Sequence, residues 1–359
     1  MNLSRLCLGA LALGLCLTSI SQAEDPAEPT LKVEHAKFAT GLGDRYALSA
    51  ICDPKSHKIF AFGGERNGPG GFDFVADAMV LDYGAKKPAW TKLTVSGPNP
   101  GKRAYSPFAV NTKERKAYMF GGFKEGGEMT NDLWSFSAKD MKWEKLHDAN
   151  VKGAPPGRDA QGLTVDEETG AVYLFGGLKG IQPMEAFNDL WKWEPKTKKW
   201  TEIKAKADDE WPCVRYFQSF TAIGGGKALL YGGNTSDVAP KGTEAHYFYE
   251  LDLKTGAWKK LSHPSELRCY QDALWHPTLK RLIVLNGGYS AANDEVFAYD
   301  PANDAWEKCG NSGHAHTYGA TVLDTVTGDI YTFGGLSEMS FMGKHAVDET
   351  HCVKISVAK

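Results

Sequence analysis

The sequence has little net charge and few long apolar stretches. Its 41 lysines and arginines nearly balance its 44 aspartates and glutamates, which leaves a formal charge of −3. That balance gives no electrostatic basis for binding nucleic acid or an anionic membrane surface. The charged residues are spread along the chain, so neither a disordered tail nor an acidic block is expected. Beyond residue 23, no segment is apolar enough to predict a membrane span.

Cysteine is also scarce. Seven cysteines are present, and two of them fall within the first 23 residues. The other five are Cys52, Cys213, Cys269, Cys309 and Cys352. An odd number leaves at least one thiol unpaired in a monomer. Cys213 and Cys269 each lie close to an arginine, Arg215 and Arg268, that recurs along the chain. They are therefore the first candidates for a disulfide bond.

The longest apolar run lies at the start of the chain. Residues 1–5 form a short basic segment, and residues 6–20 are apolar. Ser21-Gln22-Ala23 then offers small residues at the positions where a signal peptidase would cleave. The run is too short to cross a bilayer, which favours a secretory signal peptide over a membrane anchor. We therefore expect an exported protein, periplasmic or secreted. Its parts would be a signal peptide over 1–23, a polar leader over 24–29 and a single folded domain over 30–359.

Six strand-like apolar runs along the chain end in a Gly-Gly pair. The first glycines of the pairs are Gly63, Gly121, Gly176, Gly232, Gly287 and Gly334. Successive pairs are separated by 58, 55, 56, 55 and 47 residues. Repeats of this length with β-rich content predict a β-propeller. The expected fold is all-β, with six blades.

Each pair has companions at nearly fixed distances. An arginine precedes the first glycine by 17 to 19 residues in five repeats, and His314 precedes it by 20 in the sixth. The arginines are Arg45, Arg103, Arg158, Arg215 and Arg268. A tryptophan closes each of the first five repeats: Trp90, Trp143, Trp200, Trp258 and Trp306. Glycine lets the chain leave a buried strand with positive φ, and tryptophan supplies apolar surface between blades. The pattern resembles the Kelch repeat over nearly all of residues 30–359. The resemblance implies a six-bladed Kelch-type propeller.

The sixth repeat lacks a closing tryptophan. A third strand is expected from Thr350 to Ile355, and the chain then stops at Lys359. Residues 30–33, Thr-Leu-Lys-Val, resemble the fourth strands of other repeats without the tryptophan. We expect an N-terminal strand to complete the last blade, because this removes an exposed sheet edge.

Topology places the candidate binding residues on one face of the propeller. In each blade the inner strand would begin at the arginine and the second strand would end at Gly-Gly, next to the longest loops. Loops on a rigid scaffold commonly carry binding groups. The expected ligand-binding residues are Arg45, Arg103, Tyr105, Arg158, Arg215, Tyr216, Arg268, Tyr270, His314 and His316. A ring of guanidinium groups suits carboxylates or sugar hydroxyls. Alternatively, the arginines are structural and bond carbonyls and the Asn-Asp pairs of neighbouring blades.

The sixth repeat also changes its polar residues. His314 and His316 stand where other repeats are assigned arginine and tyrosine, and the following loop holds Met339, Met342 and His345. Imidazole and thioether ligands suit copper and related transition metals. A protein without a cofactor is expected, and a copper site formed by these five residues is the alternative.

Two classes of function remain open. The first is a binding module that takes an unknown protein, peptide or glycan on its arginine-lined face. The second is an enzyme. A sugar epimerase or mutarotase would need an acid and a base near the mouth of the propeller, and some exported bacterial Kelch proteins are sialic-acid mutarotases. The carboxylates placed there are Glu65, Glu125, Asp159, Asp272 and Glu338. A copper oxidase like galactose oxidase would use two tyrosines, two histidines and a Tyr–Cys crosslink.

Overall fold

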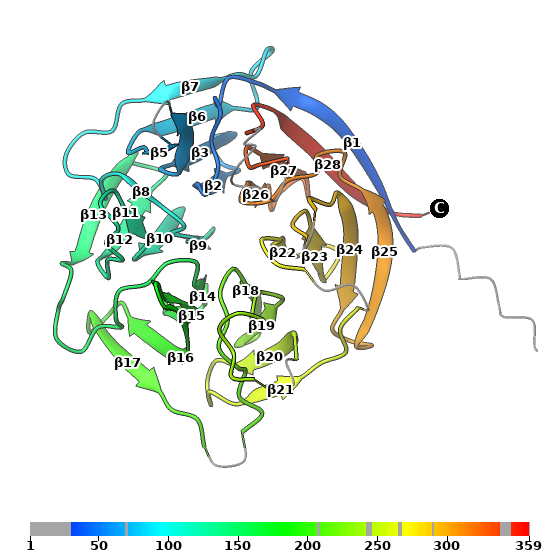
Figure 1. The fold of residues 1–359 in the computed structure, drawn as a ribbon. Helices are drawn as coiled ribbons and strands as arrows, with labels where there is room; N and C mark the ends of the chain where they lie inside the picture. The colour runs from blue at the N-terminus through cyan, green and yellow to red at the C-terminus, as the bar shows by residue number, and fades with distance from the viewer. Residues whose placement is uncertain are drawn as a thin grey trace, which may run out of the picture.

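Six antiparallel, four-stranded sheets surround a central axis in the computed structural model of the chain (Figure 1). The structure describes residues 30–68, 71–206, 209–241, 246–264, 268–288, 291–337 and 346–358. The expected signal peptide and polar leader lie outside these residues. The described part of the chain contains no helix, and hence none that could span a membrane. The predicted all-β propeller with six blades is confirmed.

Each of the first three blades is built from four strands that follow chain order, the innermost first. Blade one contains β2 (Ser49–Asp53), β3 (Lys58–Phe62), β6 (Ala78–Asp82) and β7 (Trp90–Leu93). Blade two contains β9 (Phe108–Asn111), β10 (Lys116–Phe120), β12 (Leu133–Ser137) and β13 (Lys142–His147). Blade three contains β14 (Gly162–Val165), β15 (Val172–Ile181), β16 (Met184–Glu194) and β17 (Lys199–Ile203).

The next two blades repeat this order. Blade four contains β18 (Ser219–Gly224), β19 (Lys227–Tyr231), β20 (Phe248–Asp252) and β21 (Trp258–Lys260). Blade five contains β22 (Asp272–His276), β23 (Arg281–Leu285), β24 (Glu295–Asp300) and β25 (Ala305–Asn311).

Blade six joins the two ends of the described chain. Its inner strands are β26 (Ala320–Leu323), β27 (Ile330–Phe333) and β28 (Thr350–Val357), and its outer strand is β1 (Leu31–Ala39). β1 runs antiparallel to β28, with Leu31 opposite Val357. The predicted closure by an N-terminal strand is confirmed. The strand is longer than expected because pairing continues to Ala39.

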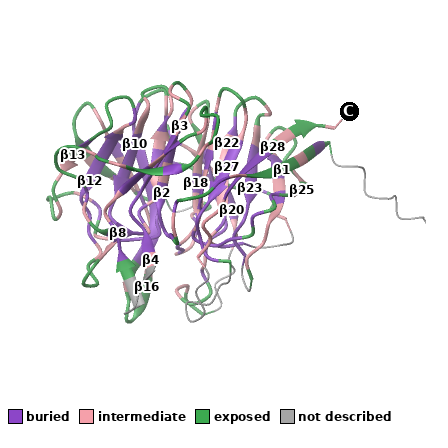
Figure 2. Ribbon diagram, turned by 90° about the horizontal axis from the view of Figure 1, so that it is seen from above, coloured by how far each residue is buried: buried purple, intermediate pink, exposed green. Residues whose placement is uncertain are grey.

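Hairpins extend the disc on one face, which we call the loop face. They are formed by β4 (Glu65–Gly68) with β5 (Gly71–Phe74), by β8 (Arg103–Ala104) with β11 (Phe123–Lys124), and by the far ends of β15 and β16. Figure 2 shows β4, β8 and β16 on the lower side of the disc. The short turns between the first and second strands of each blade lie on the opposite face. This is the predicted division between long loops and short turns.

The closing tryptophans join neighbouring blades. Each ring packs on the aromatic residue that precedes the glycine pair of the previous blade. The pairs, with centroid separations of 4.8–5.3 Å, are Trp90–Phe333, Trp143–Phe62, Trp200–Phe120, Trp258–Phe175 and Trp306–Tyr231. The outer strand of one blade is thus fixed to the second strand of the blade before it. This inter-blade contact is the role expected of these residues.

Hydrogen bonds correct the predicted register in blade five. In blade one, Glu65 directly follows the glycine pair and Tyr46 directly follows the arginine. The amide of Glu65 donates a hydrogen bond to the carbonyl of Tyr46. In blade five the equivalent donor is Gly288, which bonds Cys269. The pair is therefore Asn286-Gly287, not Gly287-Gly288. Asn286 has a φ of 61°, which asparagine adopts more readily than most residues.

The register in blade six is shifted by two residues. Thr317 pairs with Leu336 there, as Tyr46 pairs with Glu65 in blade one. His316 therefore occupies the arginine position, and Tyr318 occupies the position of Tyr105. His314, assigned to the arginine position from the sequence, lies two residues too early. The error arose because His314 and His316 are both plausible substitutes at nearly the same spacing.

Candidate functional site

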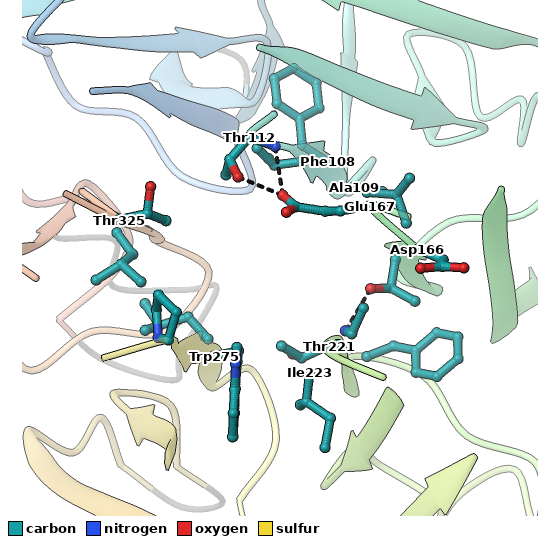
Figure 3. A pocket seen from close by; sticks show the side chains of 18 of the residues that line it. Phe108, Ala109, Thr112, Asp166, Glu167, Thr221, Ile223, Trp275 and Thr325 are labelled. Atoms are coloured by element: carbon teal, nitrogen blue, oxygen red, sulfur yellow. Dashed lines mark hydrogen bonds between the residues drawn. The ribbon is translucent and has the colours of Figure 1, made fainter. Parts of the chain in front are cut away.

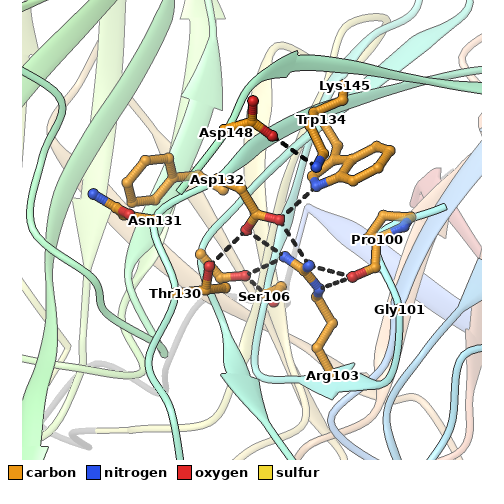
Figure 4. Close-up of polar contacts among 12 residues, drawn as sticks. Pro100, Gly101, Arg103, Ser106, Thr130, Asn131, Asp132, Trp134, Lys145 and Asp148 are labelled. Atoms are coloured by element: carbon orange, nitrogen blue, oxygen red, sulfur yellow. Dashed lines mark hydrogen bonds and ion pairs between the residues drawn. The ribbon is translucent and has the colours of Figure 1, made fainter. Parts of the chain in front are cut away.

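The five arginines lie in the protein interior, each 0–1% exposed. Figure 4 shows the arrangement around Arg103. Its Nη1 and Nη2 donate to the two carboxylate oxygens of Asp132, both at 2.9 Å, and Nη1 also donates to the carbonyl of Gly121. Trp134 Nε1 donates to the same carboxylate at 2.7 Å. The guanidinium group therefore bridges the second and third strands of its own blade.

Similar contacts recur around the ring. Arg45 pairs with Asp77, Arg158 with Asp189 and Arg268 with Glu295. Among the described residues Arg215 has no such acid partner, and it donates instead to the carbonyls of Gly232 and His246. These acids belong to the same blade as the arginine, whereas the sequence suggested neighbouring blades. The contact to the previous blade is made by the backbone, since Gly64 N donates to Arg103 O. The arginine side chains thus do not form an exposed lining of the loop face.

The residue two positions after each arginine forms a ring around the axis. These residues are Ala47, Tyr105, Ala160, Phe217, Tyr270 and, in blade six, Tyr318, and all have φ between 51° and 59°. Successive amides donate to the carbonyl of the preceding member, as from Tyr105 to Ala47 and from Ala160 to Tyr105. Positive φ is uncommon for non-glycine residues and marks positions that the surrounding structure enforces.

Four of these side chains close the axis on the loop face, and we call them the aromatic floor: Tyr105, Phe217, Tyr270 and Tyr318. Their ring centroids lie 4.4–5.8 Å apart. Tyr318 is buried, while the other three are partly exposed. The floor offers flat aromatic surface at the centre of the loop face. Such surface contributes strongly to recognition because it buries large area at low entropic cost.

Two buried carboxyl groups lie beside the floor, and we call Glu65 and Asp159 the acid pair. Glu65 is 1% exposed and accepts a hydrogen bond from Tyr46 Oη at 2.6 Å. Asp159 is 5% exposed, and its Oδ1 has no hydrogen-bond partner. Burial, together with the charge of Glu65, raises the pKa of Asp159 to about 8. An acid with a strongly shifted pKa beside a surface is a marker of functional sites.

The remaining predicted tyrosine, Tyr216, lies at the wall of this site. Its hydroxyl donates to Asp237 at 2.8 Å and approaches Met184 Sδ at 3.5 Å. Met184 and Ile181, at the tip of the β15–β16 hairpin, are among the exposed large apolar residues. The loop face therefore combines aromatic, apolar and acidic groups. Of the other carboxylates proposed from the sequence, Asp272 contacts His316, Glu125 pairs with Lys102, and Glu338 lies outside the described residues.

The opposite face opens into the central channel. A cavity of about 450 Å³ lies between the inner strands and is lined by residues such as Phe108, Thr221 and Trp275 (Figure 3). Glu167 accepts hydrogen bonds from the amide and hydroxyl of Thr112 at its rim. These bonds join blades two and three, and the bond from Ala222 N to Thr164 Oγ1 joins blades three and four.

Of the five predicted metal-binding residues, the structure describes His314 and His316. His314 and His316 lie together, with ring centroids 4.7 Å apart. Met339, Met342 and His345 lie outside the described residues. His316 Nε2 is 3.3 Å from Asp272 Oδ2, and His314 Nε2 is 3.3 Å from the carbonyl oxygen of Gly334.

His351 and Glu349 join this cluster, although no motif in the sequence assigned Glu349 to it. His351 stacks on His314 at 4.9 Å, and its Nε2 lies 3.1 Å from Glu349 Oε2. Burial and the neighbouring histidines His316 and His351 lower the pKa of His314 to about 3. The imidazole of His314 is therefore neutral at physiological pH.

The cysteines do not form the disulfide considered from the sequence. All five described cysteines are free. Cys213 Sγ lies 3.5 Å from Arg215 Nη2, while Cys269 Sγ contacts the carbonyl of Gly288. Each thiol thus makes its contact within its own blade. Burial raises the pKa of Cys269 to about 12, so this thiol is not poised for reaction.

Comparison with known proteins now places the chain in a family. Residues 32–233 and 145–335 match the model described as the KLHDC2/KLHL20/DRC7 Kelch-repeats domain. The chain belongs to this Kelch-repeat family. Kelch domain-containing protein 3 from Rattus norvegicus is 24% identical over 327 residues, which cover 85% of this chain and 78% of that protein.

Other relatives are larger proteins. Mei4-dependent protein 6 from Schizosaccharomyces pombe is 24% identical, with 56% of this Kelch chain matching 30% of its length. Host cell factor 1 from Rattus norvegicus is 28% identical, with 69% of this chain matching 13% of its length. The solved structure of YjhT has a TM-score of 0.62 at 18% identity and covers 89% of this chain and 99% of that one. That similarity shows the fold. None of these matches supports the epimerase or copper-oxidase alternatives.

Proposed function

We propose that this chain is a protein-binding Kelch propeller that takes a peptide segment of its partner on the loop face. The observation that carries the proposal is Asp159, a buried carboxyl group with an unbonded oxygen, beside a partly exposed aromatic floor. Kelch propellers commonly serve as protein-binding modules, and this supports a protein over other ligands. Export of the chain is a further proposal that rests on the sequence alone, and a glycan is the alternative ligand.

The chemistry of the site favours a basic side chain in the partner. A lysine or arginine has an apolar stem that packs on aromatic rings and a charged end that bonds a carboxylate. Tyr105 and Phe217 offer the rings, and Asp159 offers the carboxylate. The cation would also offset the desolvation that burial imposes on this acid.

Selection of peptides on the purified full chain tests the proposal. We expect peptides with a basic residue flanked by apolar or aromatic residues to be enriched. Tyr105→Ala and Asp159→Asn should each weaken the selected peptides at least tenfold in a fluorescence polarisation assay. Lys113→Ala and Thr325→Ala, at the rim of the opposite face, are the matched controls and should leave affinity unchanged.

Two results would overturn the proposal. One is that selected peptides bind the floor variants as well as the wild type but lose affinity in the rim variants, which would move the site to the channel. The other is that no peptide binds while a glycan array gives binding that the floor variants abolish, which would identify a carbohydrate ligand.

A further inference from the structure

Blade six holds a cluster of metal-ligand side chains that the peptide site does not use. One ring nitrogen each from His314 and His351 and a carboxylate oxygen of Glu349 all lie within 4.8 Å of one another. His314 comes from the link between blades five and six, Glu349 immediately precedes β28, and His351 is the second residue of that strand. The three side chains therefore converge on one point from two separate segments.

The geometry is close to that of a bound metal. Two ligands about 2.0–2.1 Å from a tetrahedral ion lie about 3.3 Å apart. His351 Nε2 and Glu349 Oε2 are 3.1 Å apart already. Little movement of either side chain would be needed to place an ion between them.

The hydrogen bonding of the two histidines also leaves ring nitrogens available to bind a metal ion. His314 Nε2 lies 3.3 Å from the carbonyl of Gly334, and donation there leaves the lone pair of Nδ1 available. Metal-bound histidines usually donate their second ring nitrogen in this way. His351 is 8% exposed, and its buried Nδ1 has no hydrogen-bond partner. The tautomer with its proton on Nδ1 leaves the lone pair of Nε2, the nitrogen that lies next to Glu349, available to an ion.

We propose that His314, Glu349 and His351 bind a divalent transition-metal ion of the Zn²⁺ class. Two imidazoles and one carboxylate form a donor set that Zn²⁺ accepts, with a fourth position left for water or another ligand. Glu349, with 39% of its side chain exposed, gives the ion a route from solvent. Bound metal would tie the link before β26 to β28, the strand on which β1 closes the ring.

Lys37 supplies an internal check on this proposal. Its Nζ lies 2.6 Å from Glu349 Oε1, and it extends from β1 opposite His351. An ammonium group there competes with a metal ion for the same carboxylate. Replacing Lys37 by methionine should therefore increase metal affinity, whereas loss of a merely structural ion pair would not.

The test is a Zn²⁺ titration of the full chain, free of affinity tags and stripped with chelator, by isothermal calorimetry. We expect one equivalent to bind and to raise the melting temperature. Glu349→Gln should weaken binding at least tenfold, His351→Ala should abolish it, and Lys37→Met should strengthen it severalfold. His263→Ala is the control, since His263 pairs with another histidine, His246, elsewhere in the chain and should leave binding unchanged.

Cobalt substitution gives a second readout. Co²⁺ should produce the visible absorption of a four-coordinate site in the wild type and lose it in Glu349→Gln, a variant at a partly exposed position. If His351→Ala fails to fold, Glu349→Gln and Lys37→Met still decide the matter. The proposal is overturned if the wild type binds no Zn²⁺, or if both of these variants bind it with wild-type affinity.

Discussion

At the scale of single residues, Arg103 illustrates what the recurring arginines contribute. Burial alone would raise the pKa of Asp132, but the hydrogen bonds and charge of Arg103 outweigh it and lower that pKa to about 2. Replacing Arg103 by alanine leaves a buried carboxylate without its cation, which costs about 3–5 kcal/mol of unfolding free energy. Urea denaturation at pH 7 measures this loss.

The stability of Arg103→Ala at different pH values tests whether the loss comes from the ion pair. The pKa of Asp132 is depressed in the folded protein, so the stabilisation is complete above about pH 4 and disappears as pH falls toward 2. The difference between wild type and Arg103→Ala should shrink over that range. Lys102→Ala, which breaks an exposed ion pair with Glu125, should have no measurable effect. An Arg103→Ala variant as stable as Lys102→Ala would show that the buried pair contributes nothing.

Asp159 should give stability the opposite dependence on pH from Asp132. Its pKa of about 8 lies above the ordinary value, so the folded protein holds a proton that the unfolded chain releases between about pH 4 and pH 8. Stability should therefore fall as pH rises through this range. Asp159→Asn removes the effect, and thermal unfolding should show the variant more stable than wild type at pH 8 and equal to it at pH 4. Equal stability of the two at pH 8 would contradict the assignment.

At the scale of elements, β1 closes the propeller by supplying the outer strand of blade six. Leu31 is 5% exposed and packs with Ile283, Leu285 and Val353 between blades five and six. Leu31→Ala should lower the unfolding free energy by about 2–5 kcal/mol, because the cavity it leaves lies at the closing strand. Lys32→Ala, at the adjacent exposed position, is the control and should leave the denaturation midpoint unchanged. Similar midpoints for the two variants would show that β1 is not needed for closure.

The repeat pattern allowed most of the fold to be predicted because its glycines and tryptophans serve the backbone and the blade contacts directly. A Cβ at Gly63 would lie 2.7 Å from the carbonyl oxygen of Arg103, so this position requires glycine. In blade five, Asn286-Gly287-Gly288 offers two possible pairs, and only the hydrogen bond from Gly288 to Cys269 distinguishes them. Spacing alone could not resolve that choice.

The candidate sites were less predictable for a different reason. Glu65 and Asp159 belong to blades one and three, and their proximity depends on how the blades between them pack. His314 and Glu349 are likewise far apart in the sequence, with β26 and β27 between them, and only the folded blade brings them together. Phe217 and Tyr318 were missed, although a signal was present: both follow the arginine position by two residues, as Tyr105 and Tyr270 do.

At the scale of the whole molecule, the two faces differ in what they present to a partner. The opposite face opens into a channel lined by strand ends, whereas the loop face is closed by the aromatic floor and carries the acid pair. A charged group of one sign beside an aromatic surface gives specificity as well as affinity. The loop face therefore favours a ligand that combines apolar surface with a positive charge.

Proton release on binding follows from this asymmetry and rests on the proposed peptide site. At pH 7 most Asp159 carboxyl groups are protonated, because burial and Glu65 raise their pKa to about 8. A bound lysine or arginine side chain favours the carboxylate, so binding expels up to one proton. The affinity of a selected basic peptide should rise between pH 6 and 8, by about tenfold per pH unit at most, and level off above that. Calorimetry in buffers of different ionisation enthalpy counts the protons, with Asp159→Asn as the variant that should bind weakly and without pH dependence. A wild-type affinity that is constant from pH 6 to 8, or a variant with the same slope, would exclude Asp159 as the group that receives the cation.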